Sequence, residues 1–187
     1  MINLKQSFFI ALFLLSIVQL SAQSISEGAA LKVSYWGQSA YQPGAKVALE
    51  LPHRAWQTDR RNKHLFSSYQ VAFYTNPGIE QGYLTGAELG IKSSPQDKSR
   101  FQAFSVGAAY LLKSDIIGFS VDLATGESSN TDRQINHIFL PTINYELGNQ
   151  LSERMNWFSK LSLGSKLSSQ SGSELVFFLE LGLQFSL

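Results

Sequence analysis

From residue 30 to the C-terminus, apolar side chains recur at every second position of the chain. In the clearest stretch, polar and small residues alternate with Leu175, Phe177, Leu179, Leu181, Leu183, Phe185 and Leu187. A period of two is the signature of a β-strand with one apolar face. Because no stretch after residue 30 has a convincing helical period, the pattern predicts an all-β fold.

Clusters of Gly, Pro, Asn and Ser divide this pattern into eight segments. The predicted strands cover residues 30–37, 44–52, 64–75, 81–93, 100–113, 134–147, 154–167 and 174–187. Residues 116–123 form a further apolar stretch, which fits either a ninth strand or a hairpin within a long loop. Eight antiparallel strands are therefore expected and ten are the alternative, because barrels made of a single bacterial chain have an even strand number.

The first 22 residues differ from the rest of the chain. Lys5 precedes an almost unbroken apolar run from Phe8 to Leu20, and Ser21 and Ala22 follow it. This order is typical of a secretory signal peptide. An uncleaved anchor is less suitable, since a helix of that length, at about 1.5 Å per residue, falls short of the roughly 30 Å hydrocarbon core. We expect a signal peptide over residues 1–22 and one domain over residues 23–187.

Alternation alone does not decide whether the apolar face meets lipid or a soluble core. The polar face mixes opposite charges with glycines, which suits the crowded interior of a narrow barrel. The predicted interior charges are Lys32, Lys46, Glu50, Glu88, Lys92, Glu146, Lys160, Lys166 and Glu180. Without helices to cover a sheet, and without water in a membrane to satisfy an open edge, an up-and-down transmembrane β-barrel is the expected fold. A soluble sandwich or lipocalin-like binder, with the faces inverted, is the alternative.

Aromatic residues near strand ends favour the assignment of the apolar face to lipid. Tyr145 closes one predicted strand, Trp157 opens the next, and Phe185 lies near the end of the last. We expect these three side chains at one rim of the barrel, as an interfacial girdle. With both termini periplasmic, the external loops are residues 38–43, 76–80, 113–134 and 168–173, of which the third is the longest.

Composition narrows the functions that this chain can have. Charged residues make up 16% of the 187 residues, with 15 Lys and Arg against 14 Asp and Glu, and there is no cysteine. Such a balanced, weakly charged chain does not favour nucleic-acid binding. The missing cysteines exclude disulfides, thiolate metal sites and a lipid-anchoring cysteine. No cofactor is expected, since no glycine-rich phosphate loop opens a helix.

The last eight residues carry a more specific pattern. Glu180, Gly182, Phe185 and Leu187 match the order polar, any, Gly, any, any, apolar, any, apolar. This order resembles the C-terminal β-signal of bacterial outer-membrane proteins. Together with residues 41–51 and 139–148, it makes the chain similar to small outer-membrane β-barrel proteins of Gram-negative bacteria. The resemblance implies transient recognition of residues 180–187 by the barrel-assembly machinery.

Candidate chemistry is sparse. His53, His64 and His137 lack metal-ligand spacing with another histidine or with a carboxylate on one face, so no metal site is expected. His137 with Ser120, Asp122 or Ser128 is the one combination of the type that lipid-modifying barrel enzymes use. The simpler interpretation places His137 at the membrane–water boundary.

Residues 53–64 concentrate four basic side chains around Trp56 in one predicted periplasmic loop. Such a loop either meets anionic headgroups or a partner, at about 1 kcal/mol per basic residue, or is simply solvated.

These observations predict a non-enzymatic outer-membrane protein with a structural, surface-interaction or accessory role. The alternatives are a narrow channel or small-solute transporter, a soluble secreted binder and, last, a lipid-modifying enzyme. The expected partners are outer-membrane lipid, transiently the assembly machinery, and a protein that the sequence does not identify.

Overall fold

The computed structural model describes residues 28–37, 43–76, 79–96, 99–121, 128–168 and 172–187. The regular structure of these residues is all β, in eight consecutive strands. They are β1 (Ala30–Gly37), β2 (Gly44–Thr58), β3 (Arg61–Asn76), β4 (Glu80–Pro95), β5 (Arg100–Val121), β6 (Ser128–Ser152), β7 (Met155–Ser168) and β8 (Gly172–Ser186). In these ranges no helix is long and apolar enough to span a membrane. The predicted signal peptide lies outside the described residues.

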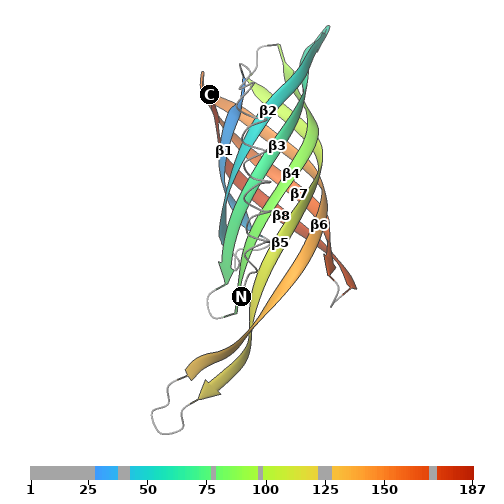
Figure 1. The fold of residues 1–187 in the computed structure, drawn as a ribbon. Coiled ribbons are helices and arrows are strands. Elements are labelled where there is room, and N and C mark those ends of the chain that lie inside the picture. Colours follow the sequence, from blue (N-terminus) through green and yellow to red (C-terminus); the bar gives the residue numbers. More distant parts are fainter. Residues whose placement is uncertain (1–27, 38–42, 77–78, 97–98, 122–127, 169–171) are drawn as a thin grey trace, which may run out of the picture.

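Every strand pairs antiparallel with its neighbour in the sequence, and β8 pairs with β1, so the sheet closes into a barrel (Figure 1). Along the seam, each residue from Ala30 to Gly37 has a partner between Leu179 and Ser186. Closure lets the backbone satisfy its own hydrogen bonds, as hydrocarbon surroundings require. The prediction of an eight-stranded up-and-down barrel is confirmed, and residues 116–121 continue β5 rather than forming a ninth strand.

The register fixes how wide the barrel is. The path of paired residues that starts at Ala30 runs once around the ring and reaches β8 at Val176, ten positions before Ser186, the β8 partner of Ala30. On the way it passes through Glu50, Ser68, Glu88, Gly107, Thr142 and Gly164. This stagger tilts the strands, as Figure 1 shows. Eight tilted strands leave an interior that side chains can just fill.

The predicted basic loop over residues 53–64 is wrong in one respect, since most of it belongs to strands. β2 continues to Thr58 and β3 begins at Arg61, with a two-residue turn between them. A bulge between Pro52 and Ala55 interrupts the pairing. The apolar alternation stops near this bulge, but the backbone pairing of β2 with β3, and of β3 with β4, continues to the tip of the hairpin. Pairing outside the membrane needs no apolar face, which is why the pattern missed it.

The predicted outer loop over residues 113–134 is also largely strand. β5 runs to Val121, β6 starts at Ser128, and the two pair with each other as far as Val121 and Ser128. They form a ribbon that projects beyond the barrel at the end opposite the C-terminus (Figure 1). Residues 122–127 lie outside the described residues, and Asp122 with them. Here again the strands extend past the region in which alternating hydrophobicity is required.

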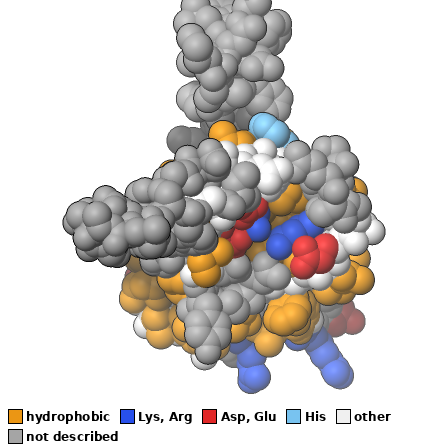
Figure 2. Space-filling model, turned by 90° about the horizontal axis from the view of Figure 1, so that it is seen from below, with side chains coloured by type: hydrophobic (Ala, Val, Ile, Leu, Met, Phe, Trp, Pro, Cys, Tyr) orange, Lys and Arg blue, Asp and Glu red, His pale blue; other side chains and the backbone are white. Residues whose placement is uncertain are grey.

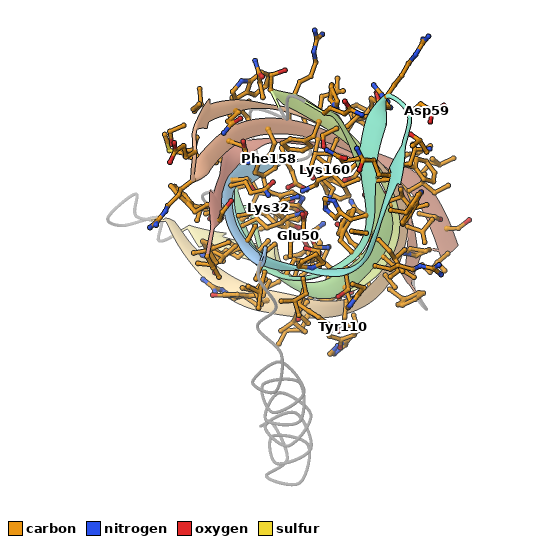
Figure 3. The ribbon with its side chains drawn as sticks, turned by 90° about the horizontal axis from the view of Figure 1, so that it is seen from above. Lys32, Glu50, Asp59, Tyr110, Phe158 and Lys160 are labelled. Atoms are coloured by element: carbon orange, nitrogen blue, oxygen red, sulfur yellow. The ribbon has the colours of Figure 1, made fainter. Side chains whose placement is uncertain are left out.

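The two faces of the barrel match the alternation in the sequence. Large apolar side chains are exposed on the outer face of all eight strands, among them Val33, Val71, Val106 and Leu179. Charged side chains such as Lys32 and Glu50 are buried inside the ring (Figure 3). A soluble barrel requires the reverse arrangement, so this exterior is suited to hydrocarbon and not to water.

The three residues expected in one aromatic girdle do not share a level. Phe185 pairs with Met155 and Trp157 with Asn149, so both lie close to the turn between β6 and β7. Tyr145 pairs with Leu161, four positions further from that turn on each strand. The prediction failed for Tyr145 because the end of the apolar alternation is not the end of the strand, which continues to Ser152.

Replacing Leu179 with Arg tests the lipid-facing assignment. Leu179 is 56% exposed on the outer face in the middle of β8, and an arginine near the bilayer midplane costs about 2–4 kcal/mol. Ser173→Arg is the matched control, because it lies on the same face of the same strand near its end, where the cost is about 0–1 kcal/mol. Urea unfolding in lipid vesicles measures both; equal losses would contradict the assignment.

Candidate functional site

The interior of the barrel holds a layer of four lysines and four glutamates, and all eight residues are buried. They come from six of the eight strands: Lys32, Lys46, Glu50, Glu88, Lys92, Glu146, Lys160 and Glu180. The charges within this layer are therefore balanced. Burying ionised groups away from water costs free energy unless the groups are paired. The equal numbers of lysines and glutamates therefore allow these residues to lie together in one narrow lumen.

Lys32 joins two of the glutamates. Its Nζ lies 2.7 Å from Glu50 Oε2 and donates to both Glu146 oxygens at 2.7 and 2.8 Å. Lys92 donates to the second oxygen of Glu50 and, at 3.2 Å, to the side-chain oxygen of Gln184. These contacts link β1, β2, β4, β6 and β8 across the lumen (Figure 3).

A second chain of contacts lies beside the first. Lys160 Nζ donates to Glu88 at 2.7 Å and lies 3.9 Å from Glu180. Glu180 also forms an ion pair with Lys46 and accepts a 3.4 Å hydrogen bond from Ser34. Each of the two glutamates in this second set of contacts has more than one donor. The contacts therefore connect strands that are not neighbours in the ring.

Neutral polar groups complete this second chain. Ser105 donates to Glu88 at 3.1 Å, and Asn144 Nδ2 donates to Ser105 at 3.1 Å. They extend the contacts to β5, which contributes no charge to the layer. The network thus ties the wall together from the inside.

Lys166, the ninth predicted interior charge, lies outside this layer. It is 3.9 Å from Glu174, whose side chain is 66% exposed, on strand segments close to the residues that join β7 and β8. The sequence assigned Lys166 to the inward face correctly but did not reveal how far along the axis it lies, because alternation carries no information about depth.

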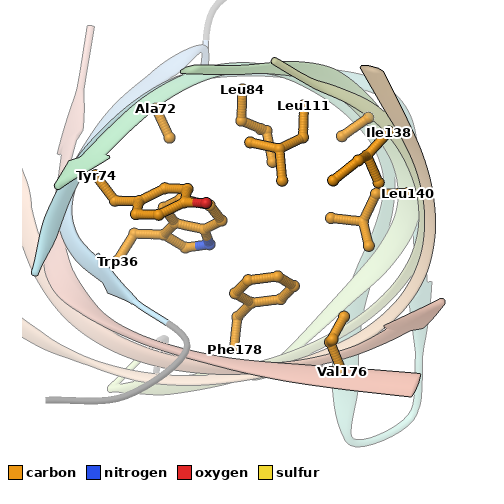
Figure 4. Packing of buried hydrophobic residues seen from close by; sticks show 10 residues of the cluster. Trp36, Ala72, Tyr74, Leu84, Leu111, Ile138, Leu140, Val176 and Phe178 are labelled. Carbon is orange, nitrogen blue, oxygen red and sulfur yellow. The ribbon is translucent and has the colours of Figure 1, made fainter. Parts of the chain in front are cut away.

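A layer of buried apolar side chains lies next to the ionic layer. It consists of Trp36, Ala72, Tyr74, Leu84, Ala109, Leu111, Ile138, Leu140, Val176 and Phe178 (Figure 4). In β1, Trp36 lies beyond Lys32 and Ser34, and in β8, Phe178 precedes Glu180. The layer therefore lies on the side of the ionic layer that faces the β5–β6 ribbon. Trp36 stacks on Phe178 with ring centroids 5.0 Å apart.

This apolar layer is absent from the sequence prediction, which treated the inward face as polar throughout. The available signal was an apolar residue on both faces of a strand, as in Val176–Phe177–Phe178. Inward glycines beside it are equally informative: a Cβ at Gly82 would lie 2.0 Å from the Tyr74 ring. Such glycines make room for rings that cross the lumen.

The mouth at the ribbon end of the barrel carries a smaller polar group of its own. Lys113 lies 2.5 Å from Glu80 and 3.0 Å from Asp115, and Asn136 donates to Asp115 at 2.8 Å. Seen from this end, charged side chains gather in the centre and apolar ones surround them (Figure 2). The lumen thus changes along the axis from ionic to apolar to polar.

A cavity of about 680 Å³ opens at the other mouth, the end at which the C-terminus lies. Lys92 of the ionic layer and its neighbour Gln184 line it, together with Trp56, Lys63 and His64 of the β2–β3 hairpin. Backbone pairing joins the hairpin to β4 as far as Arg61 and Pro95, and the Arg61 side chain donates to Ser93 at 3.4 Å. The cavity ends at the ionic layer, of which Lys92 lines it.

The three histidines have different surroundings. His53 Nε2 is 2.9 Å from the Ser67 hydroxyl, and the His64 ring lies against Phe66. His137 is exposed on the outer face of β6 and is hydrogen-bonded through Nδ1 to the Tyr110 hydroxyl. Across the described ranges, no group of three or more His, Asp or Glu side chains is placed to hold a metal ion.

The structure does not bring His137 close to Ser120 or Ser128. His137 pairs with Leu112, whereas Ser120 and Ser128 lie eight and nine positions along their strands, out on the ribbon. Asp122 lies outside the described residues. The sequence analysis placed these residues close together because it assumed a compact loop. In the structure, the extended ribbon takes the place of that loop.

The four residues of the C-terminal pattern lie at the closing seam. Glu180 is buried in the ionic layer, and Gly182 pairs with Ser34, whose Cβ would lie 2.6 Å from a Cβ at position 182. Phe185 pairs with Leu31, and the Leu187 amide donates to the Ala29 carbonyl at 2.9 Å. The polar and glycine positions of the pattern therefore have structural reasons in this barrel.

No protein-family model and no curated protein matches this sequence. Among solved structures, the fold is similar to the N-terminal β-barrel domain of OprF from Pseudomonas aeruginosa, with a TM-score of 0.54 and 13% identity. That match covers 86% of this chain and 98% of the OprF domain. Neisserial surface protein A, NspA, has a TM-score of 0.50 and 12% identity, over 85% of this chain and 94% of NspA.

At these identities the similarity concerns the fold. It agrees with the closed ring of strands and the apolar exterior. The chain therefore has the fold of small eight-stranded outer-membrane β-barrels, as the sequence pattern predicted.

Glu50→Gln tests the ionic layer. The substitution keeps the shape of the side chain but leaves Lys32 and Lys92 without the charge they share, and breaking a buried pair costs about 3–5 kcal/mol. Glu174→Gln is the control, because its exposed pair with Lys166 is worth at most about 1 kcal/mol. Urea unfolding followed by tryptophan fluorescence gives both values; a loss at Glu50 no larger than that at Glu174 would contradict the network.

Proposed function

We propose that this protein is a non-enzymatic, non-conducting barrel that anchors the β5–β6 ribbon at the cell surface, where the ribbon contacts other molecules. The observation that carries this proposal is the filled interior. An ionic layer, an apolar layer and a polar mouth follow one another along the axis. Narrow eight-stranded barrels of this kind enclose side chains rather than a water-filled channel.

The ribbon supports the second half of the proposal. Ile116 is the last residue of β5 that bonds to the β4 side, through its amide and the Ile79 carbonyl at 2.9 Å. β6 pairs with β7 only from Ile138 onward. Within the described residues, the ribbon beyond these points has no neighbouring strand on either edge. Strand edges of this kind are templates for pairing with another extended chain.

Assembly in the outer membrane is part of the proposal. We propose that the barrel-assembly machinery recognises Glu180, Gly182, Phe185 and Leu187 as the terminal strand. The position of these residues at the seam supports this, because β8 is the strand that closes the ring on β1.

Planar-bilayer recording tests the closed lumen. The folded barrel is expected to give no single-channel steps. The double substitution Trp36→Ala and Phe178→Ala removes two rings from the apolar layer but leaves the ionic layer in place. This variant is therefore expected to give no single-channel steps either. Steady conductance steps from the unsubstituted barrel would contradict the proposal and support a narrow channel.

In-cell photo-crosslinking tests the surface contact. A photoreactive amino acid at Arg133, an exposed position where β6 pairs with Ile116 of β5, is expected to form adducts with other proteins on intact cells. The same amino acid at Glu153, in the turn between β6 and β7, is the control for the opposite end. Adducts from position 153 alone, or from neither position, would contradict a role of the ribbon in surface contact.

A further inference from the structure

A hollow of about 530 Å³ lies in the outer surface of the barrel, across β1 to β6. It exists because small side chains occupy neighbouring outward positions there. Ala87 pairs directly with Ala108, and Thr85 is the next outward residue on β4. The flanking outward pairs on the same strands are large, with Leu89 opposite Val106. The surface is therefore lowered over one short stretch of two adjacent strands.

Large side chains border this lowered stretch on both sides. Tyr69 and Val71 of β3 pair with Ala87 and Thr85, and Tyr110 of β5 pairs with Phe139 of β6. All four of these large residues line the hollow, and all are partly exposed on the outer face. The lining carries no charged side chain among the described residues. It is a groove with mainly aromatic walls and a floor of small side chains.

A polar pair marks one end of the groove. The Tyr110 hydroxyl is hydrogen-bonded to His137 Nδ1, and the two ring centroids are 5.9 Å apart. His137 lies two residues from Phe139 on the same face of β6, toward the ribbon. Tyr110 is seen on the outside of the ring in Figure 3. The groove therefore runs from an apolar middle to a polar end at the outer side of the membrane.

We propose that this groove binds one acyl chain of an outer-leaflet lipid, with the polar linkage of that lipid beside Tyr110 and His137. The groove opens onto hydrocarbon, where water does not compete, and leaving it empty would forfeit the dispersion contacts of its walls. A second barrel presents a convex wall, which cannot reach the floor of a concave groove. A flexible methylene chain can follow both walls and the floor.

The site is independent of the proposed function, because it uses neither the lumen nor the ribbon. It distinguishes this face of the barrel from the outer face of β7 and β8, which contributes no residue to the hollow. Van der Waals packing is the main attraction available between apolar groups within a bilayer, so a groove that contacts a chain on three sides retains it longer than a convex part of the wall does.

Photo-labelling in vesicles tests the proposal. The folded barrel is reconstituted with a phospholipid that carries a diazirine in the middle of one acyl chain, and labelled residues are mapped by mass spectrometry. We expect labelling of the groove to exceed that of the outer face of β7 and β8 by about tenfold, which corresponds to about 1.4 kcal/mol of preference. Even labelling around the barrel would overturn the proposal.

Ala108→Phe fills the floor of the groove and is expected to bring its labelling down to the level of β7 and β8. Ser165→Phe adds the same ring to the outer face of β7, on a strand that does not line the groove, and is expected to leave groove labelling unchanged. Ala87→Phe replaces the first variant if that variant does not fold, as judged by gel mobility. Equal labelling in the filled and control variants would overturn the proposal.

The position of the diazirine tests the orientation of the chain. Moved next to the carbonyl carbon, it is expected to label Tyr110, His137 and Phe139 rather than Tyr69 and Ala87. The reverse result would mean that the chain enters from the inner leaflet, and would overturn the assignment of the polar end.

Discussion

Closure of β8 on β1 is the constraint on which the rest of this structure depends. A sheet in hydrocarbon cannot leave an edge unpaired, so eight strands have to meet in a ring whose width is fixed by strand number and stagger. That ring is narrow, and everything on the inward face of each strand has to fit within it. The glycine at position 182, where a Cβ would collide with Ser34 across the seam, shows how directly closure limits the sequence.

The narrow lumen explains the composition of the inward face. Lysines and glutamates occur there in equal numbers because each buried charge needs a partner, and Lys32 satisfies both Glu50 and Glu146. Beyond this layer the same space is filled by rings, with Trp36 stacked on Phe178. Some of the ionic contacts, such as Lys32–Glu146 and Lys160–Glu88, join strands that are not neighbours in the ring, whereas backbone pairing joins only neighbours. The two kinds of interaction therefore hold the wall in different directions.

Sequence alternation predicted the strand number, the order and the two faces, because a period of two is enforced wherever one face meets lipid. It failed where that enforcement ends. The β2–β3 hairpin beyond Pro52 and the β5–β6 ribbon are paired but not amphipathic, so they were predicted as loops. Alternation also carries no information about depth along the barrel axis. Tyr145 and Lys166 were therefore assigned to a face, but Tyr145 was placed at the wrong level and Lys166 was given no level. The groove at Ala87 and Ala108 could be recognised only once the register placed these two small residues side by side.

The central claim is that the chain forms a closed barrel within the outer membrane, and gel mobility tests it most directly. The outer-membrane fraction is run in cold detergent with and without boiling. A closed barrel, in which every strand is paired on both sides and an ionic layer fills the interior, is expected to stay folded without heat and to migrate differently from the boiled chain. Identical migration, with the protein recovered in the soluble fraction, would contradict the account.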